Sequence, residues 1–101
     1  MRIAVDGMGG DNAPREIVKG CVEVSKLISD EIIIVGDKTQ IQNELRKYRY
    51  NKKQIKIVHA PEVIKNEDAP VRAVRTKVES SLVKGINLVK DKEADLLISA
   101  G

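Results

Sequence analysis

Four short segments of this chain are rich in isoleucine and valine, and longer segments of mixed polarity separate them. The apolar segments are Arg2–Asp6, Glu31–Val35, Ile55–His59 and Ala94–Ile98, and they have the length and β-branched content of strands. The second contains a continuous run of isoleucine and valine, which is typical of a strand buried on both faces. The pattern therefore predicts four β-strands.

The three longer segments repeat their apolar residues at steps of three and four, which is the spacing of one face of a helix. We therefore expect helices between the strands, the third resuming at Ala69–Pro70. For this third segment the pattern allows either one helix or two helices broken at Ser80–Ser81. The apolar faces are Ile17, Val18, Cys21, Val22, Ser25 and Ile28; then Ile41, Leu45 and Tyr48; then Val71, Val74, Val78, Leu82, Ile86 and Val89.

Polar residues mark the starts of the first two helices. Asp11 or Asn12 is expected to cap the first, with Pro14 in its first turn, where a missing N–H group costs little. Asp37 and Gln40 have the spacing of a capping box. Strands and helices thus alternate as βαβαβαβ, which predicts a three-layer α/β fold with a mainly parallel sheet and helices on both faces.

Length and composition agree with one α/β unit. The chain has 101 residues, of which 42% are hydrophobic and 33% charged, so it is neither a disordered polar tract nor a membrane span. It contains two tyrosines and no phenylalanine or tryptophan, and this aromatic-poor core suits buried parallel strands. The last predicted strand ends in the beginning of a loop, so we expect residues 1–101 to be the N-terminal part of one larger α/β domain.

The net charge and the cysteine content limit the cellular location and the kinds of ligand that we expect for the protein. A net charge of +3 does not by itself indicate nucleic acid binding, and none is expected. No export signal or spanning run is present, and the single cysteine fits a reducing cytoplasm. With one cysteine and one histidine, a zinc site is not expected. Cys21 lies in the apolar face of a helix and is predicted to be a core side chain rather than a reactive thiolate.

The segment Asp6–Asn12 follows the first strand and contains three glycines. Glycines allow the backbone to approach an anion closely, and the next helix would present unpaired N–H groups to it. The segment lacks the Gly-Lys-Ser/Thr of a Walker loop, and Asn12 stands where a dinucleotide fingerprint has its third glycine. Either an anion-binding loop or a simple tight turn therefore remains open.

Two further features carry candidate chemistry. His59 lies at the carboxyl end of the third strand, where it suits a general base, an oxyanion donor, or merely a tie for the loop. A basic run with no acidic residue follows the second helix. It is either favourable charge at a helix end or a docking surface for an acidic partner. The run contains Arg46, Lys47, Arg49, Lys52, Lys53 and Lys56, with Tyr48 and Tyr50 among them.

Four stretches of the chain match a known family in order and spacing. The residues from Met1 to Pro14 closely resemble the N-terminus of the bacterial phosphate acyltransferases of phospholipid synthesis, also called acyl-ACP:phosphate acyltransferases. Gly7 departs from their usual alanine, and Ala69 from a frequent lysine. The other matching stretches are Ile57–Ile64, Ala69–Val71 with Ser80–Ser81, and Ile98–Gly101.

This resemblance implies a fold similar to isocitrate and isopropylmalate dehydrogenases, in a chain about three times as long as this one. It implies transfer of a fatty acyl group from acyl carrier protein to inorganic phosphate, which gives an acyl phosphate. It also implies a cytoplasmic homodimer that associates peripherally with the membrane and needs no cofactor. Residues 1–101 alone are expected to be inactive, because no following helix covers the fourth strand.

For this chemistry our hypothesis is that backbone N–H groups of Gly7–Asp11 and of Ser99–Gly101 hold phosphate. Ser80, Ser81 and His59 would be supporting donors, and His59 is also the catalytic candidate. Two alternatives remain: a phosphate acetyl- or butyryltransferase that uses coenzyme A thioesters, and a non-catalytic module that binds an anion or a nucleotide. The expected phosphate- and substrate-binding residues are Asp6, Gly7, Gly9, Gly10, Asp11, Asn12, Ser80, Ser81, Ser99 and Gly101.

Overall fold

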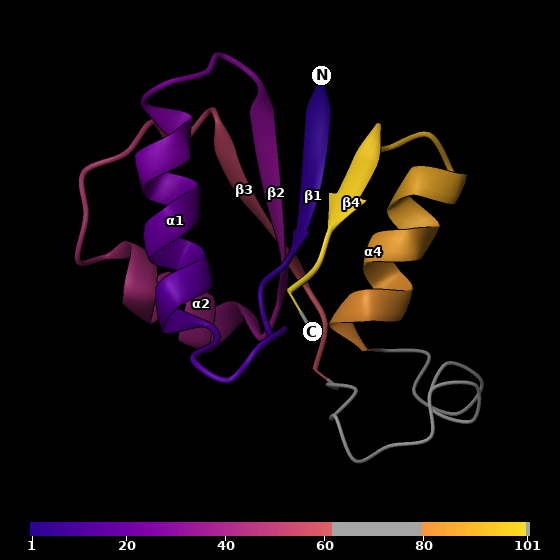
Figure 1. Cartoon of the computed structure of the whole chain (residues 1–101), viewed down its shortest axis with the longest axis horizontal. Coiled ribbons are helices and arrows are strands. Elements are labelled where there is room, and N and C mark those ends of the chain that lie inside the picture. Colours follow the sequence, from indigo (N-terminus) through magenta and orange to yellow (C-terminus); the bar gives the residue numbers. More distant parts are fainter. Residues whose placement is uncertain (62–79, 101) are drawn as a thin grey trace.

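The computed structural model describes residues 1–61 and 80–100 of the chain. Within them, four parallel strands form one sheet in the order β3-β2-β1-β4 (Figure 1). The α/β fold with a parallel sheet is therefore confirmed. The strands are β1 (Arg2–Asp6), β2 (Glu31–Gly36), β3 (Ile55–His59) and β4 (Leu96–Ile98), and the helices are α1 (Arg15–Ser25), α2 (Lys38–Leu45) and α4 (Ser81–Lys90).

The side chains of β2 separate the two faces of the sheet. Ile32 and Ile34 pack against α1 and α2, whereas Ile33 and Val35 belong to a second cluster with residues of α4. All four side chains are buried, as the uninterrupted apolar run predicts. Helices therefore cover both faces, and the three-layer arrangement is confirmed (Figure 1).

The first three strands lie where the sequence predicts them, but the fourth is shorter than expected. β4 begins at Leu96, whereas the sequence predicts a strand from Ala94. The Ala94 amide donates to the Leu88 carbonyl at 3.0 Å, so this residue still belongs to the turn that ends α4. The Ala94 side chain is nevertheless buried in the second cluster, together with Ile33 and Val35.

The start of α1 also differs from the prediction. Neither Asp11 nor Asn12 caps this helix with its side chain, because residues 11–14 form turns and Pro14 itself is the N-cap residue. Asn12 contributes its backbone carbonyl instead, which accepts from the Glu16 amide at 3.1 Å. The cap of α2 is confirmed, since the Asp37 side chain accepts from the Gln40 amide at 3.0 Å.

Helix α4 begins at Ser81, so no single helix runs through Ser80–Ser81. Ser80 has an extended backbone, and its hydroxyl accepts from the Val83 amide, which caps the helix. The expected apolar face is only partly right in this helix: Val89 packs against the second cluster, but Ile86 is 45% exposed, and the buried positions are Ser81 and Gly85. A Cβ atom at Gly85 would lie 2.7 Å from Leu97 Cδ1, so the glycine allows close packing of α4 on β4. The expected helical positions from Ala69 to Val78 lie outside the described residues.

Cys21 provides a test of the packing of α1. Its side chain is buried, as predicted, and burial raises the pKa of the thiol from 9.0 to about 11. Because the folded pKa is the higher one, this group stabilises the fold below pH 9, and the contribution is lost as the pH rises towards 11. We expect a disulfide reagent at about pH 8 to label the native thiol far more slowly than the thiol of urea-unfolded protein. Equal labelling rates would contradict this packing.

No helix within residues 1–61 and 80–100 has the length and apolar character needed to cross a membrane.

Candidate functional site

The order of the strands reverses at β1. The chain passes from β1 to β2 and β3 on one side, and returns to β4 on the other side of β1. In open α/β sheets, ligands bind outside the carboxyl ends of the strands at such a reversal. These ends point towards the lower edge of Figure 1, where the described chain also finishes. The candidate site is therefore built from the residues that follow β1 and β4.

Asp6 joins three segments at this edge. Its Oδ1 atom accepts from the Ser81 hydroxyl at 2.5 Å and from the Met8 amide at 3.0 Å. Its Oδ2 atom accepts from the Ser99 hydroxyl at 3.0 Å. Asp6 is 5% exposed, so these bonds replace the water that a buried carboxylate would otherwise require. Asp6 thus holds the ends of β1 and β4 and the start of α4 together.

The glycine loop after β1 divides into two parts. The Gly7 amide donates to the Val35 carbonyl at 2.8 Å and the Met8 amide to Asp6, so neither N–H group is available to an anion. Among the described residues, no acceptor is assigned to the backbone amides from Gly9 to Asn12. Gly10 has a φ of +89°, a conformation that favours glycine, and faces Ala100 of the β4 loop. The N–H groups of this second part therefore have no acceptor in the described chain, and their expected role in binding an anion stays a prediction.

Three serines of the expected site, Ser80, Ser81 and Ser99, differ in what their hydroxyl groups bond to. Ser80 and Ser81 are both buried, and their hydroxyls serve the cap of α4 and the bond to Asp6. Ser99 is exposed and lies at the mouth of the site, where it donates to Asp6. Ser80 and Ser81 thus position the site, whereas Ser99 also borders it. Gly101 lies outside the described residues.

His59 lies apart from this cluster. It ends β3, which is two strands from β1, a separation of about 10 Å across the sheet. Its Nδ1 atom accepts from the Lys38 amide at 3.1 Å, at the start of α2. Since Nδ1 accepts, the neutral ring carries its proton on Nε2. His59 thus ties β3 to α2, and its catalytic role stays a prediction.

The sequence reasoning missed Lys84. Its amine donates to the His59 carbonyl at 3.1 Å, which brings a cation to the carboxyl edge of the sheet. The helical spacing from Ser80 and Ser81 could have indicated this position, because residues three and four apart lie on one face of a helix. Within residues 1–61 and 80–100, no group of three or more histidine, cysteine, aspartate or glutamate side chains is arranged to hold a metal ion.

The comparison with known proteins identifies the family. The family described as "Fatty acid synthesis protein" matches residues 1–101, the whole chain. The chain belongs to this family. It is 57% identical over 102 residues to the phosphate acyltransferase of Clostridium acetobutylicum, covering 100% of the chain and 31% of that relative. It is 48% identical over 101 residues to the phosphate acyltransferase of Clostridioides difficile, covering 100% of the chain and 30% of that relative.

These comparisons confirm the resemblance expected from the four matching stretches. They also show that the chain spans about a third of the length of the curated relatives it matches. In this member of the family, the glycine loop and the Asp6 cluster meet at the strand reversal of the sheet.

Proposed function

We propose that the whole protein transfers a fatty acyl group from acyl carrier protein to inorganic phosphate and releases an acyl phosphate for phospholipid synthesis. The relatives' name, phosphate acyltransferase, supports the reaction class, and the family's description supports a fatty acyl group. The observation that carries the proposal is the run of amides from Gly9 to Asn12, which has no assigned acceptor in the described chain and lies beside the strand reversal.

The chemistry requires little from protein side chains. A phosphate oxygen attacks the carbonyl carbon of the thioester, a C–O bond forms, the C–S bond breaks, and the thiolate leaves with the electron pair. A thiol with a pKa of about 8.5 is a good leaving group, so no protein nucleophile is needed. The demands that remain are a fixed position for phosphate and N–H donors for the developing oxyanion.

The described residues supply parts of this machinery. Backbone amides from Gly9 to Asn12 would bind phosphate, and the loop that starts at Ser99 would close the site from the β4 side. Asp6 fixes both loops through its bonds to Met8 and Ser99, so it acts as a positioning residue. His59 would contribute through its Nε2–H group as a supporting donor. The same proposal includes a cytoplasmic homodimer with peripheral membrane association.

The product of the whole protein tests this function. The protein is supplied with inorganic phosphate and a long-chain acyl thioester, either on acyl carrier protein or on coenzyme A, and acyl phosphate is followed by phosphorus NMR. We expect the product with the carrier protein as donor. Product from coenzyme A thioesters alone would indicate an acetyl- or butyryltransferase type of enzyme. Binding of phosphate without any product would indicate a non-catalytic anion-binding module.

A further inference from the structure

The segment after α2 carries a dense positive charge. Between Arg46 and Lys56 the sequence contains six basic residues and no acidic one, and all six side chains are exposed. Two of the six have ion-pair partners: Lys47 lies 2.9 Å from Glu44, and Lys56 lies 3.5 Å from Glu31. The other four, Arg46, Arg49, Lys52 and Lys53, make no ion pair with the described residues, and we call them the basic surface.

The end of α2 does not account for this charge. A helix dipole favours cations only within about the last turn, and the last turn of α2 contains no basic residue. Arg46 follows directly as the C-cap residue and bonds to Asn43, so the dipole can account for it. Arg49, Lys52 and Lys53 lie further along the connection to β3. Their charges repel one another without a compensating group in the described fold, so a partner of opposite charge would lower this repulsion.

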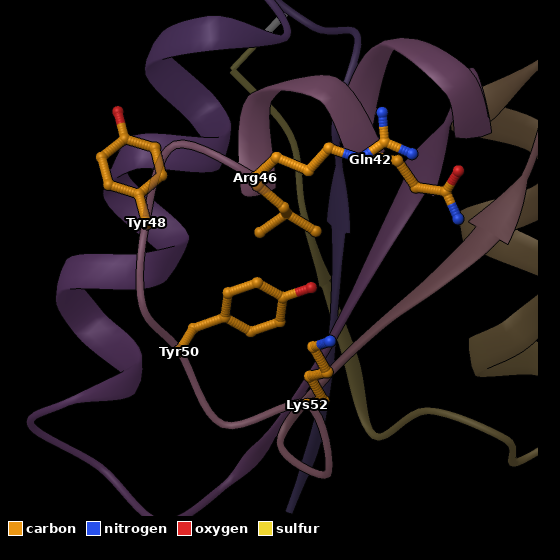
Figure 2. A pocket seen from close by; sticks show the side chains of 6 residues that line it. Gln42, Arg46, Tyr48, Tyr50 and Lys52 are labelled. Carbon is orange, nitrogen blue, oxygen red and sulfur yellow. The ribbon is translucent and has the colours of Figure 1, made fainter.

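A pocket opens within the basic surface. It has a volume of about 500 Å³ and is lined by Gln42, Leu45, Arg46, Tyr48, Tyr50 and Lys52. Figure 2 shows Arg46, Tyr50 and Lys52 around one hollow, with the Tyr48 hydroxyl directed away from it. Both tyrosine rings pack against the core cluster of α1 and α2, so the walls of the pocket are held in place. The hollow thus offers cationic and hydroxyl donors on a firm base.

We propose that the basic surface docks an acidic protein, one of whose carboxylate side chains enters the pocket between Arg46 and Lys52. Complementary charge accelerates such an encounter and fixes its orientation. A membrane fits less well, because none of the exposed large apolar side chains of the described chain belongs to this surface. A nucleic acid also fits less well, because the tyrosine rings are packed on the core rather than presented for stacking.

The basic surface is distinct from the candidate site, because it lies in the connection between α2 and β3, and β3 is two strands away from β1 in the sheet. Its assignment as a docking surface therefore goes beyond the proposed reaction. It rests on the proposed function only for the choice of probe. If the acyl donor is carried by an acidic protein, that carrier is the partner to test first. Direct binding and turnover are measured separately, so that failure of the docking surface and failure of the reaction give different results.

The test compares the whole protein with its R46E/K52E variant and with a control, K19E/K26E, which makes the same change in charge at Lys19 of α1 and at Lys26, the C-cap residue of that helix. Binding of acyl carrier protein is measured by fluorescence anisotropy at low and high salt. We expect R46E/K52E to weaken binding at least about tenfold at low salt, with a smaller difference at high salt. The control should bind like the unmodified protein. Unchanged binding by R46E/K52E, or an equal loss in the control, would overturn the proposal.

Two further measurements separate docking from damage to the fold. With a small soluble acyl thioester as donor, R46E/K52E should retain the unmodified turnover, because no protein has to dock. If that turnover also falls, the neutral variant R46Q/K52Q is measured, and wild-type carrier binding by it would overturn the proposal. Loss of binding to vesicles of anionic lipid, with carrier binding intact, would assign the basic surface to the membrane instead.

Discussion

Replacing Asp6 with alanine is expected to lower the free energy of unfolding of the whole protein by about 3 kcal/mol and to remove most of its acyl transfer. The change leaves the buried Ser81 hydroxyl and the Met8 amide without their acceptor and releases Ser99. The buried Ser81 hydroxyl accounts for most of this loss, because a hydrogen bond to a charged group contributes roughly 1.5–3 kcal/mol, whereas water can replace Asp6 at the exposed Ser99. Urea unfolding and an acyl phosphate assay measure the two effects.

Asp11→Ala is the matched control for this experiment. Asp11 is an exposed carboxylate of the same loop, and no hydrogen bond to its side chain is assigned among the described residues. Its replacement should change the unfolding free energy by less than about 0.5 kcal/mol. An Asp6→Ala protein as stable as the Asp11→Ala protein and as active as the unmodified protein would show that the three segments are held together by other contacts.

Asp6→Asn separates charge from shape at the same position. The amide oxygen can accept one or two of the three bonds, but the amide nitrogen must then face a hydroxyl or a backbone N–H group. We expect an intermediate loss of stability, with turnover reduced more than phosphate binding, because the loops shift but the amides from Gly9 to Asn12 remain. Full activity in Asp6→Asn would restrict Asp6 to a role in packing.

Much of the fold can be predicted from local patterns. The strands β1, β2 and β3 are short β-branched segments, and their two-sided burial is encoded in the continuous apolar run of β2. Where local patterns fail, a distant contact decides the outcome. Gly85, rather than Ile86, faces the sheet, because Leu97 of β4 needs the space that a missing side chain leaves.

The position of the candidate site could be predicted from the sequence, but the hydrogen bonds that hold it together could not. The glycines after β1 indicate a turn at the sheet edge, and parallel strands place the ends of β1 and β4 together. The sequence does not show that Asp6 bonds to Ser81 and Ser99, which are 75 and 93 residues away. That pairing depends on the register Val5–Ile98, which has no local signal. Helical spacing could place Lys84 on one face with Ser80 and Ser81, but its bond to the distant His59 carbonyl has no local signal either.

Gly10 is the residue whose replacement tests the loop most directly. At a φ of +89°, any side chain with a Cβ atom is strained by about 1–2 kcal/mol, and a branched one by more. Space is not the obstacle, because the nearest atom to a Cβ here is Ala100 Cβ at 3.7 Å. A Gly10→Val protein should therefore fold, but with the loop turned towards a negative φ and the amides of Gly10 and Asp11 redirected.

We expect Gly10→Val to raise the KM for phosphate by about tenfold or more, which corresponds to about 1.4 kcal/mol, while the KM for the acyl donor changes little. The matched control is Gly20→Ala on α1, where a Cβ atom meets nothing within 4 Å and helix propensity should improve stability by up to about 1 kcal/mol. A Gly10→Val enzyme with an unchanged phosphate KM would mean that phosphate is bound by residues other than this loop, and the site would then have to be sought on the β4 side of the reversal.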